Sequence, residues 1–152
     1  MPDWLASRFS PLGLLVVVLQ QIPGIIWALH PPKLDPFAKN SGTWLVEMLE
    51  KTFGIATLVF VVVVPTSGTM PPMMRALLRS GAFLVLAAYY LFYIQYYRGV
   101  TAWPVLLGMA AFPPLLFVLV ALSQGNWLAI LTGVVFGIVH VGLTYKNLGH
   151  LR

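Results

Sequence analysis

The chain has 152 residues, of which 59% are hydrophobic and only 9% are charged, with a formal net charge of +5 and a mean hydropathy of +0.87. So little polar surface cannot cover a soluble globule of this size, which excludes that class and predicts an integral membrane protein. The absence of cysteine excludes disulfides, thiolate metal sites and a cysteine nucleophile, and the scattered basic residues exclude a nucleic-acid-binding stripe.

Five apolar stretches follow one another along the chain, each about 17 to 22 residues long. A helix rises about 1.5 Å per residue, so stretches of this length match a hydrocarbon core of ~30 Å. None of them alternates with a period of two, which excludes a β-barrel. We therefore predict an all-α fold: a polytopic membrane helix bundle of five transmembrane helices in a single domain, with helices at about 13–29, 43–64, 76–97, 102–122 and 127–145.

The second stretch reads TWLVEMLEKTFGIATLVFVVVVP and carries Glu47, Glu50 and Lys51 in its first half. Residues 53–64 alone are too short to cross the hydrocarbon core, so we expect one helix that continues through the charged turn. Glu47 and Lys51 are spaced to form an i,i+4 ion pair, which could simply neutralise both charges at headgroup level. Glu50 would compete for the same cation, so one of the two carboxyls is expected to hold a proton and to be able to act as an acid.

Tyrosines follow one face of the third stretch, at the i, i+4 and i+7 positions Tyr89, Tyr93 and Tyr96. Tyr89 and Tyr93 lie deep in the stretch, where a phenol needs a hydrogen-bond partner, and we expect them to join an internal polar cluster. Aromatic residues near the ends of the stretches are expected in an interfacial aromatic belt instead: Tyr96, Tyr97, Trp103 and Trp127.

Polar or helix-breaking residues also interrupt the remaining stretches. Gln20 and Gln21 lie near the middle of the first. Pro113 and Pro114 are expected to break the fourth helix near its centre and to release backbone carbonyls one turn earlier. His140 lies near the end of the fifth stretch, where a lone histidine is as often a structural interhelical contact as a catalytic group.

The charged turn, the tyrosines and the histidine all lie towards the same membrane face, so we expect them to form one site. No nucleotide-binding, serine-hydrolase or metal-ligand motif occurs, and we expect neither a metal nor a cofactor. What remains is acid–base chemistry in an aromatic-walled pocket. The candidate catalytic residues are Glu50, Glu47 and His140, and the candidate substrate-binding residues are Tyr89, Tyr93, Lys51, Gln20 and Gln21.

The segments IIWALHPPK, LVEMLEK and FGIVH resemble segments found, in this order, in a group of small bacterial integral-membrane proteins. The resemblance implies a bacterial inner-membrane location and carries over no functional residue. The positive-inside rule favours a cytoplasmic C-terminus, because the loops on that side carry more basic residues, five against three. The five are Lys33, Lys39, Arg98, Lys146 and Arg152, and the three are Arg8, Arg75 and Arg79.

Two hypotheses of different classes follow from these residues. In the first, the protein is an enzyme that isomerises or cyclises a lipophilic, isoprenoid-like substrate by acid–base catalysis. In the second, it is a non-enzymatic subunit with a membrane-protein partner or a second copy, or a small proton-coupled transporter, in which Glu47, Lys51 and His140 hold helices together or carry a proton. A substrate-sized pocket lined by Glu50, Tyr89 and His140 would favour the enzyme, and a tightly packed polar cluster would favour the subunit.

Overall fold

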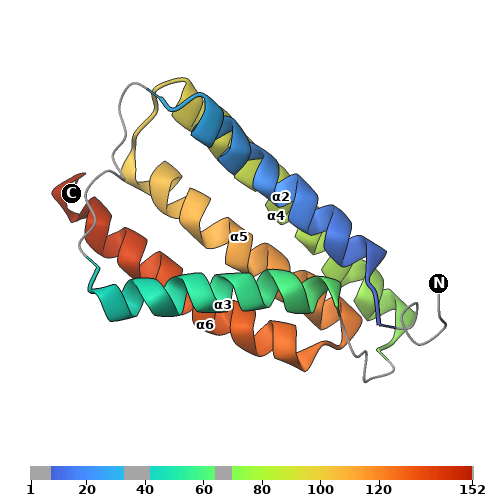
Figure 1. Ribbon diagram of the computed structural model, residues 1–152. Coiled ribbons are helices and arrows are strands. Elements are labelled where there is room, and N and C mark those ends of the chain that lie inside the picture. The colour runs from blue at the N-terminus through green and yellow to red at the C-terminus, as the bar shows by residue number, and fades with distance from the viewer. Residues whose placement is uncertain (1–7, 33–41, 64–69, 152) are drawn as a thin grey trace.

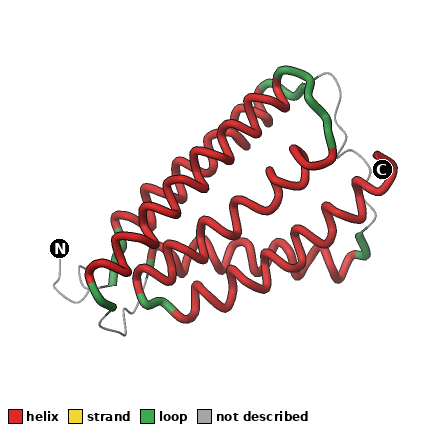
Figure 2. The backbone as a smooth tube through the Cα atoms, turned by 180° about the vertical axis from the view of Figure 1, so that it is seen from behind, coloured by secondary structure: helices red, strands yellow, loops and turns green. Residues whose placement is uncertain are grey.

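The computed structural model describes residues 8–32, 42–63 and 70–151, and this part of the chain is built from helices (Figure 1). The all-α prediction is therefore confirmed. The tube in Figure 2 shows the same bundle from behind, without a strand among the described residues. The helices are α2 (Pro11–Leu29), α3 (Trp44–Val62), α4 (Pro72–Tyr97), α5 (Trp103–Gln124), α6 (Trp127–Asn147) and a short 3-10 helix, η1 (Leu148–Leu151).

Four of these helices, α2, α4, α5 and α6, are long and apolar enough to cross a membrane, which fits a membrane location. α3 is also 19 residues long but carries the three charged residues Glu47, Glu50 and Lys51. It runs without interruption from Trp44 through the charged turn to Val62, as the sequence predicted. The structure thus supports a membrane helix bundle with four candidate spans and a fifth helix that differs from them by its charges.

The expected break in the fourth helix is wrong. α5 continues as a helix through Pro113 and Pro114, and both prolines are buried. A proline ring fixes φ at about −65°, which suits a helix, so the main cost is the loss of the two N–H donors. The packing of α5 against its neighbours holds the helix together at this point.

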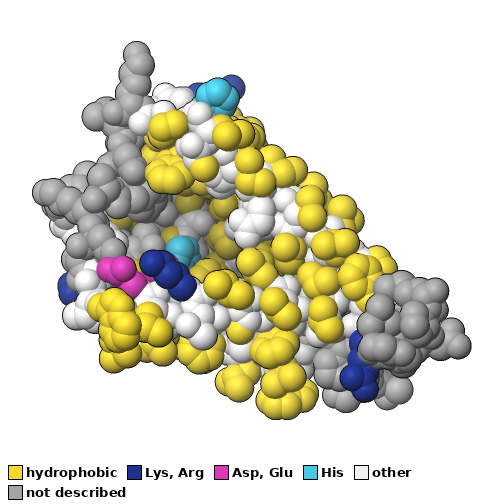
Figure 3. All heavy atoms as spheres, in the orientation of Figure 1, with side chains coloured by type: hydrophobic (Ala, Val, Ile, Leu, Met, Phe, Trp, Pro, Cys, Tyr) yellow, Lys and Arg dark blue, Asp and Glu magenta, His cyan; other side chains and the backbone are white. Residues whose placement is uncertain are grey.

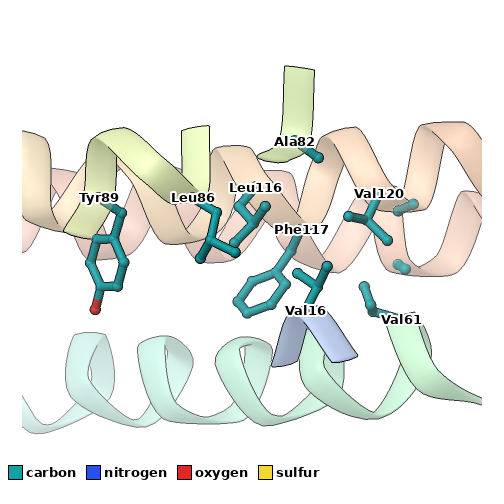
Figure 4. Close-up of a cluster of buried hydrophobic side chains, with 10 residues drawn as sticks. Val16, Val61, Ala82, Leu86, Tyr89, Leu116, Phe117 and Val120 are labelled. Carbon is teal, nitrogen blue, oxygen red and sulfur yellow. The ribbon is translucent and has the colours of Figure 1, made fainter. Parts of the chain in front are cut away.

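α5 forms the centre of the bundle. Consecutive antiparallel helices pack on it, α4 on one side and α6 on the other, and α3 packs along α6 (Figure 1). α2 contacts α3 most, then α5, and α4 least. The apolar core lies along α5, where side chains from four other helices meet it (Figure 4). Its members include Val16, Val61, Leu86, Tyr89, Leu116, Phe117 and Val120.

α2 and α3 touch closely at only one end of the bundle. The Ser10 N–H donates to the Val62 carbonyl at 2.8 Å, and a Cβ added at Gly13 would overlap the Val61 carbonyl oxygen. The start of α6 reinforces this end, because the Asn126 Nδ2 donates to the Phe60 carbonyl of α3 at 2.6 Å. Away from this contact α2 and α3 diverge in both ribbon views, so the bundle is a wedge with a closed end and an open end.

Substitutions of two glycines in α2 test whether the α2–α3 contact stabilises the closed end of the bundle. Gly13→Ala should lower the free energy of unfolding by about 1–3 kcal/mol, because the added methyl group forces α2 away from α3. Gly24→Ala is the matched control, because nothing lies within 4 Å of a Cβ there. Thermal unfolding of both variants in the same detergent measures the difference. Equal stability would show that the α2–α3 contact does not hold the wedge.

Candidate functional site

A pocket of about 350 Å³ lies towards the open end of the wedge, between α2, α4, α5 and α6. Figure 3 shows this face hollowed beside α3, with a histidine in the hollow and acidic and basic side chains at its rim. The pocket is lined mostly by aromatic and apolar side chains, together with one histidine and one threonine. These residues are Trp27, Tyr89, Tyr93, Tyr96, Met109, Ala110, Pro113, His140 and Thr144.

Glu50 of α3 and His140 of α6 form the central polar contact of the site. The Glu50 Oε1 lies 2.5 Å from the His140 Nδ1, and the two side chains are only 22% and 29% exposed. His140 lines the pocket, whereas Glu50 lies behind it and is not among the lining residues. Because Nδ1 is held by the carboxylate, Nε2 is the nitrogen left for a molecule in the pocket.

The close packing of α3 on α6 places this pair. The Phe136 ring stacks on the His140 imidazole with centroids 5.0 Å apart, and Gly54 leaves the space that the Phe136 ring fills. A Cβ at Gly54 would lie 3.2 Å from that ring. Gly137, the residue after Phe136 in α6, approaches Pro114 of α5 in the same way, with 3.1 Å to a built Cβ. Small residues therefore bring three helices together around the histidine.

The tyrosines of α4 form a continuous aromatic wall. Tyr93 lies between Tyr89 and Tyr96, with centroid distances of 5.3 Å and 6.2 Å and nearly perpendicular rings. Tyr96 is 1% exposed and lines the pocket, so its expected place in an interfacial belt is wrong. Its side chain turns inwards because the α4–α5 turn brings Leu106 and Met109 against it. Tyr97 and Trp127 are exposed, as a belt requires.

Pro113 and Pro114 leave acceptors in the pocket wall. Neither proline can donate to the carbonyl four residues earlier, so the Met109 and Ala110 carbonyls lose their helical donors. Met109, Ala110 and Pro113 all line the pocket. The released carbonyls expected from the sequence thus lie at the site, although the helix does not break there.

The other predicted site residues divide between the pocket and its surroundings. Gln20 is buried beside Tyr89, and its Oε1 has no hydrogen-bond partner. Gln21 is half-buried and does not line the pocket. Lys51 is exposed and does not line the pocket, and the ion pair between described residues of this region joins Glu50 to His140. The packing of α3 on α6, rather than the spacing of charges along α3, brings Glu50 to His140.

Six lining residues were not among the site residues predicted from the sequence: Trp27, Tyr96, Met109, Ala110, Pro113 and Thr144. Trp27 had a signal, because it lies seven residues after Gln20 and so on the same face of α2. Thr144 follows His140 by four residues in α6 and shares its face in the same way.

Among the described residues, no group of three histidines or acidic residues could hold a metal ion. Comparisons with protein-family models, with curated proteins and with solved structures found no match. The function therefore has to be argued from the geometry of the pocket and of the Glu50–His140 pair.

A double-mutant cycle tests whether Glu50 and His140 depend on each other. The unfolding free energies of Glu50→Ala, His140→Ala and the double variant should give a coupling of about 1–2 kcal/mol, the range of a charge-assisted hydrogen bond within a membrane bundle. Glu47→Ala combined with His140→Ala is the matched control and should give no coupling. Coupling of the control pair, with none between Glu50 and His140, would contradict the observed contact.

Proposed function

We propose that this integral membrane protein binds a lipophilic molecule in the aromatic pocket and exchanges a proton with it through the Glu50–His140 pair. The observation that carries the proposal is the 2.5 Å contact between the Glu50 carboxylate and a histidine that lines the pocket. A carboxylate fixes the tautomer and the orientation of an imidazole and stabilises its protonated form. His140 is therefore ready to accept or donate a proton at Nε2.

An isomerisation or a cyclisation is the reaction class that needs least beyond these groups. In an isomerisation, His140 removes a proton from one carbon of the ligand, the double bond shifts, and the imidazolium returns the proton to another carbon. No electron is gained or lost, and neither water nor a redox cofactor is consumed. His140 is the catalytic residue in this scheme, and Glu50 is a positioning residue. This reverses the expectation that a glutamate is the acid, because Glu50 does not line the pocket.

The walls of the pocket favour a lipophilic ligand. Aromatic and aliphatic side chains dominate the lining, and its volume of about 350 Å³ falls at the small end of the range for ligand sites. The space-filling view shows this face hollowed beside α3 (Figure 3), so a molecule dissolved in the bilayer could reach the pocket from the side.

We also propose that α3 is a fifth membrane span, with the N-terminus outside and the C-terminus in the cytoplasm of a bacterial inner membrane. An ionisable group facing lipid costs about 3 kcal/mol, but Glu50 faces α6 and has His140 as its partner. Glu47 lies in the first turn of α3 and Lys51 one turn later, near the membrane surface, where a lysine side chain can extend to water.

Reporter fusions test the number of spans. Five spans place the two termini on opposite sides of the membrane, and four spans place them on the same side. A reporter active only in the cytoplasm should work at the C-terminus and fail at the N-terminus, and a reporter active only outside should give the reverse pattern. Both termini on one side would show that α3 does not cross the membrane.

A proton-coupled transporter is the second candidate, and the wedge shape favours it. The pocket opens towards one end of the bundle, while contacts such as Ser10 to Val62 and Asn126 to Phe60 close the other. A transporter also needs a site that is open to one side at a time and a group that binds a proton.

Deuterium uptake separates the two candidates. Lipophilic molecules that copurify with the protein in nanodiscs should be extracted and compared by mass spectrometry with those from Ala110→Trp, which fills the pocket. The wild type should retain a molecule that this variant lacks and, in D₂O, should place deuterium on its carbon atoms. Glu50→Gln should slow the uptake at least tenfold with little change in folded yield, and Glu47→Gln should not.

A retained molecule without deuterium uptake would favour the transporter over the enzyme. If the wild type and Ala110→Trp retain the same molecules, the pocket is not a ligand site and the proposal is wrong.

A further inference from the structure

We infer that the pocket selects for positive charge and that its ligand is a lipophilic ammonium compound. This inference rests on the proposed function only in that it uses the same pocket as the ligand site. It adds the chemical class of the ligand, which the acid–base pair alone does not give.

Four aromatic side chains from two helices surround the pocket: Trp27 from α2 and Tyr89, Tyr93 and Tyr96 from α4. The planes of Tyr89 and Tyr93 meet at 70°, and those of Tyr93 and Tyr96 at 86°. Rings set at right angles present faces and edges in different directions, as the walls of a cage do. The face of an aromatic ring carries partial negative charge and attracts a cation, and groups of aromatic rings are a known means of recognising ammonium ligands.

Acceptors without a helical donor favour a ligand that donates hydrogen bonds. The Met109 and Ala110 carbonyls lose their helical donors to Pro113 and Pro114, and both residues line the pocket. Gln20, whose side chain hydrogen-bonds Tyr89, has a buried Oε1 without a hydrogen-bond partner, although Gln20 is not among the lining residues. Unsatisfied buried acceptors are costly, and an ammonium group near them supplies N–H donors. This favours a primary or secondary ammonium over a quaternary one.

The charged residues around the pocket also favour a cationic ligand. Among the described residues, its lining contains no lysine and no arginine, so an anion would have no permanently charged partner there. The Glu50 carboxylate contacts His140 and offsets positive charge on either the histidine or a ligand. Lys51, the basic residue one position further along α3, is exposed rather than part of the lining.

Decyl compounds that differ only in the head group test the inference. Binding of decylammonium, decanol and decyl sulfate to the wild type should be measured by isothermal titration in neutral-lipid nanodiscs, with empty nanodiscs subtracted. Decylammonium should bind at least tenfold more tightly than decanol, and decyl sulfate should not bind specifically. Decyltrimethylammonium should bind more weakly than decylammonium, because it cannot donate to the carbonyls.

Two variants of Tyr93 test whether the face of its aromatic ring causes the preference for a cation. Tyr93→Phe keeps the aromatic ring and should retain the preference for the cation. Tyr93→Leu removes the ring, so it should lower the affinity for decylammonium about tenfold and the affinity for decanol by less. Tyr97→Leu is the matched control on the same helix, because Tyr97 is exposed and does not line this pocket.

The outcomes separate this inference from the proposed function. If decanol and decylammonium bind equally and Ala110→Trp abolishes both, the pocket binds lipophilic molecules but the preference for a cation is wrong. If neither compound binds above the empty nanodiscs, both the inference and the proposed ligand site are wrong.

Discussion

The constraint on which the site depends is the partner that a carboxyl group needs when it lies among apolar helices. Glu50 meets this need with His140, and the contact can form only if α3 packs closely on α6. Gly54 provides that approach by leaving room for Phe136, which in turn stacks on the imidazole. The same contact holds the Nδ1 of His140, so the pairing that gives Glu50 a partner in the bundle also leaves Nε2 available to the pocket.

The wedge shape follows from a different set of contacts. The backbones of α2 and α3 meet at Gly13 and Val61, where a side chain on the glycine would not fit. Helices that touch at one end and diverge from it leave space at the other, and α5 forms the floor of that space. The prolines of α5 lie there with the carbonyls that they leave without helical donors. The open end thus combines an aromatic wall, carbonyls without helical donors and the Glu50–His140 contact.

Much of the helical architecture could be predicted from the sequence, because apolar stretches of membrane length are a strong signal. The charged turn was correctly placed inside a continuous helix by the same length argument. The expectation that Glu50, Tyr89, Tyr93 and His140 lie in one region also needed only depth along each helix. The functional roles of these residues stay predictions.

The errors have a common cause, which is that periodicity does not say which helices are neighbours. Glu47 and Lys51 have the right spacing for an ion pair, but spacing along α3 gave no sign that the packing of α3 on α6 brings Glu50 to His140. Tyr96 lies near a helix end, as belt residues do, but the turn into α5 buries it. Pro113 and Pro114 lack the backbone N–H and so favour a helix break, but packing against the surrounding helices keeps α5 helical through both.

Nitrogen NMR on protein labelled with ¹⁵N-histidine tests the central claim most directly, because the chain has only three histidines. The account predicts that decylammonium shifts the Nε2 signal of His140 and leaves that of His30 unchanged. It also predicts that Glu50→Gln shifts the Nδ1 signal of His140. A His140 spectrum that responds neither to the ligand nor to Glu50→Gln would contradict the account, because the histidine would then neither face the ligand nor be held by Glu50.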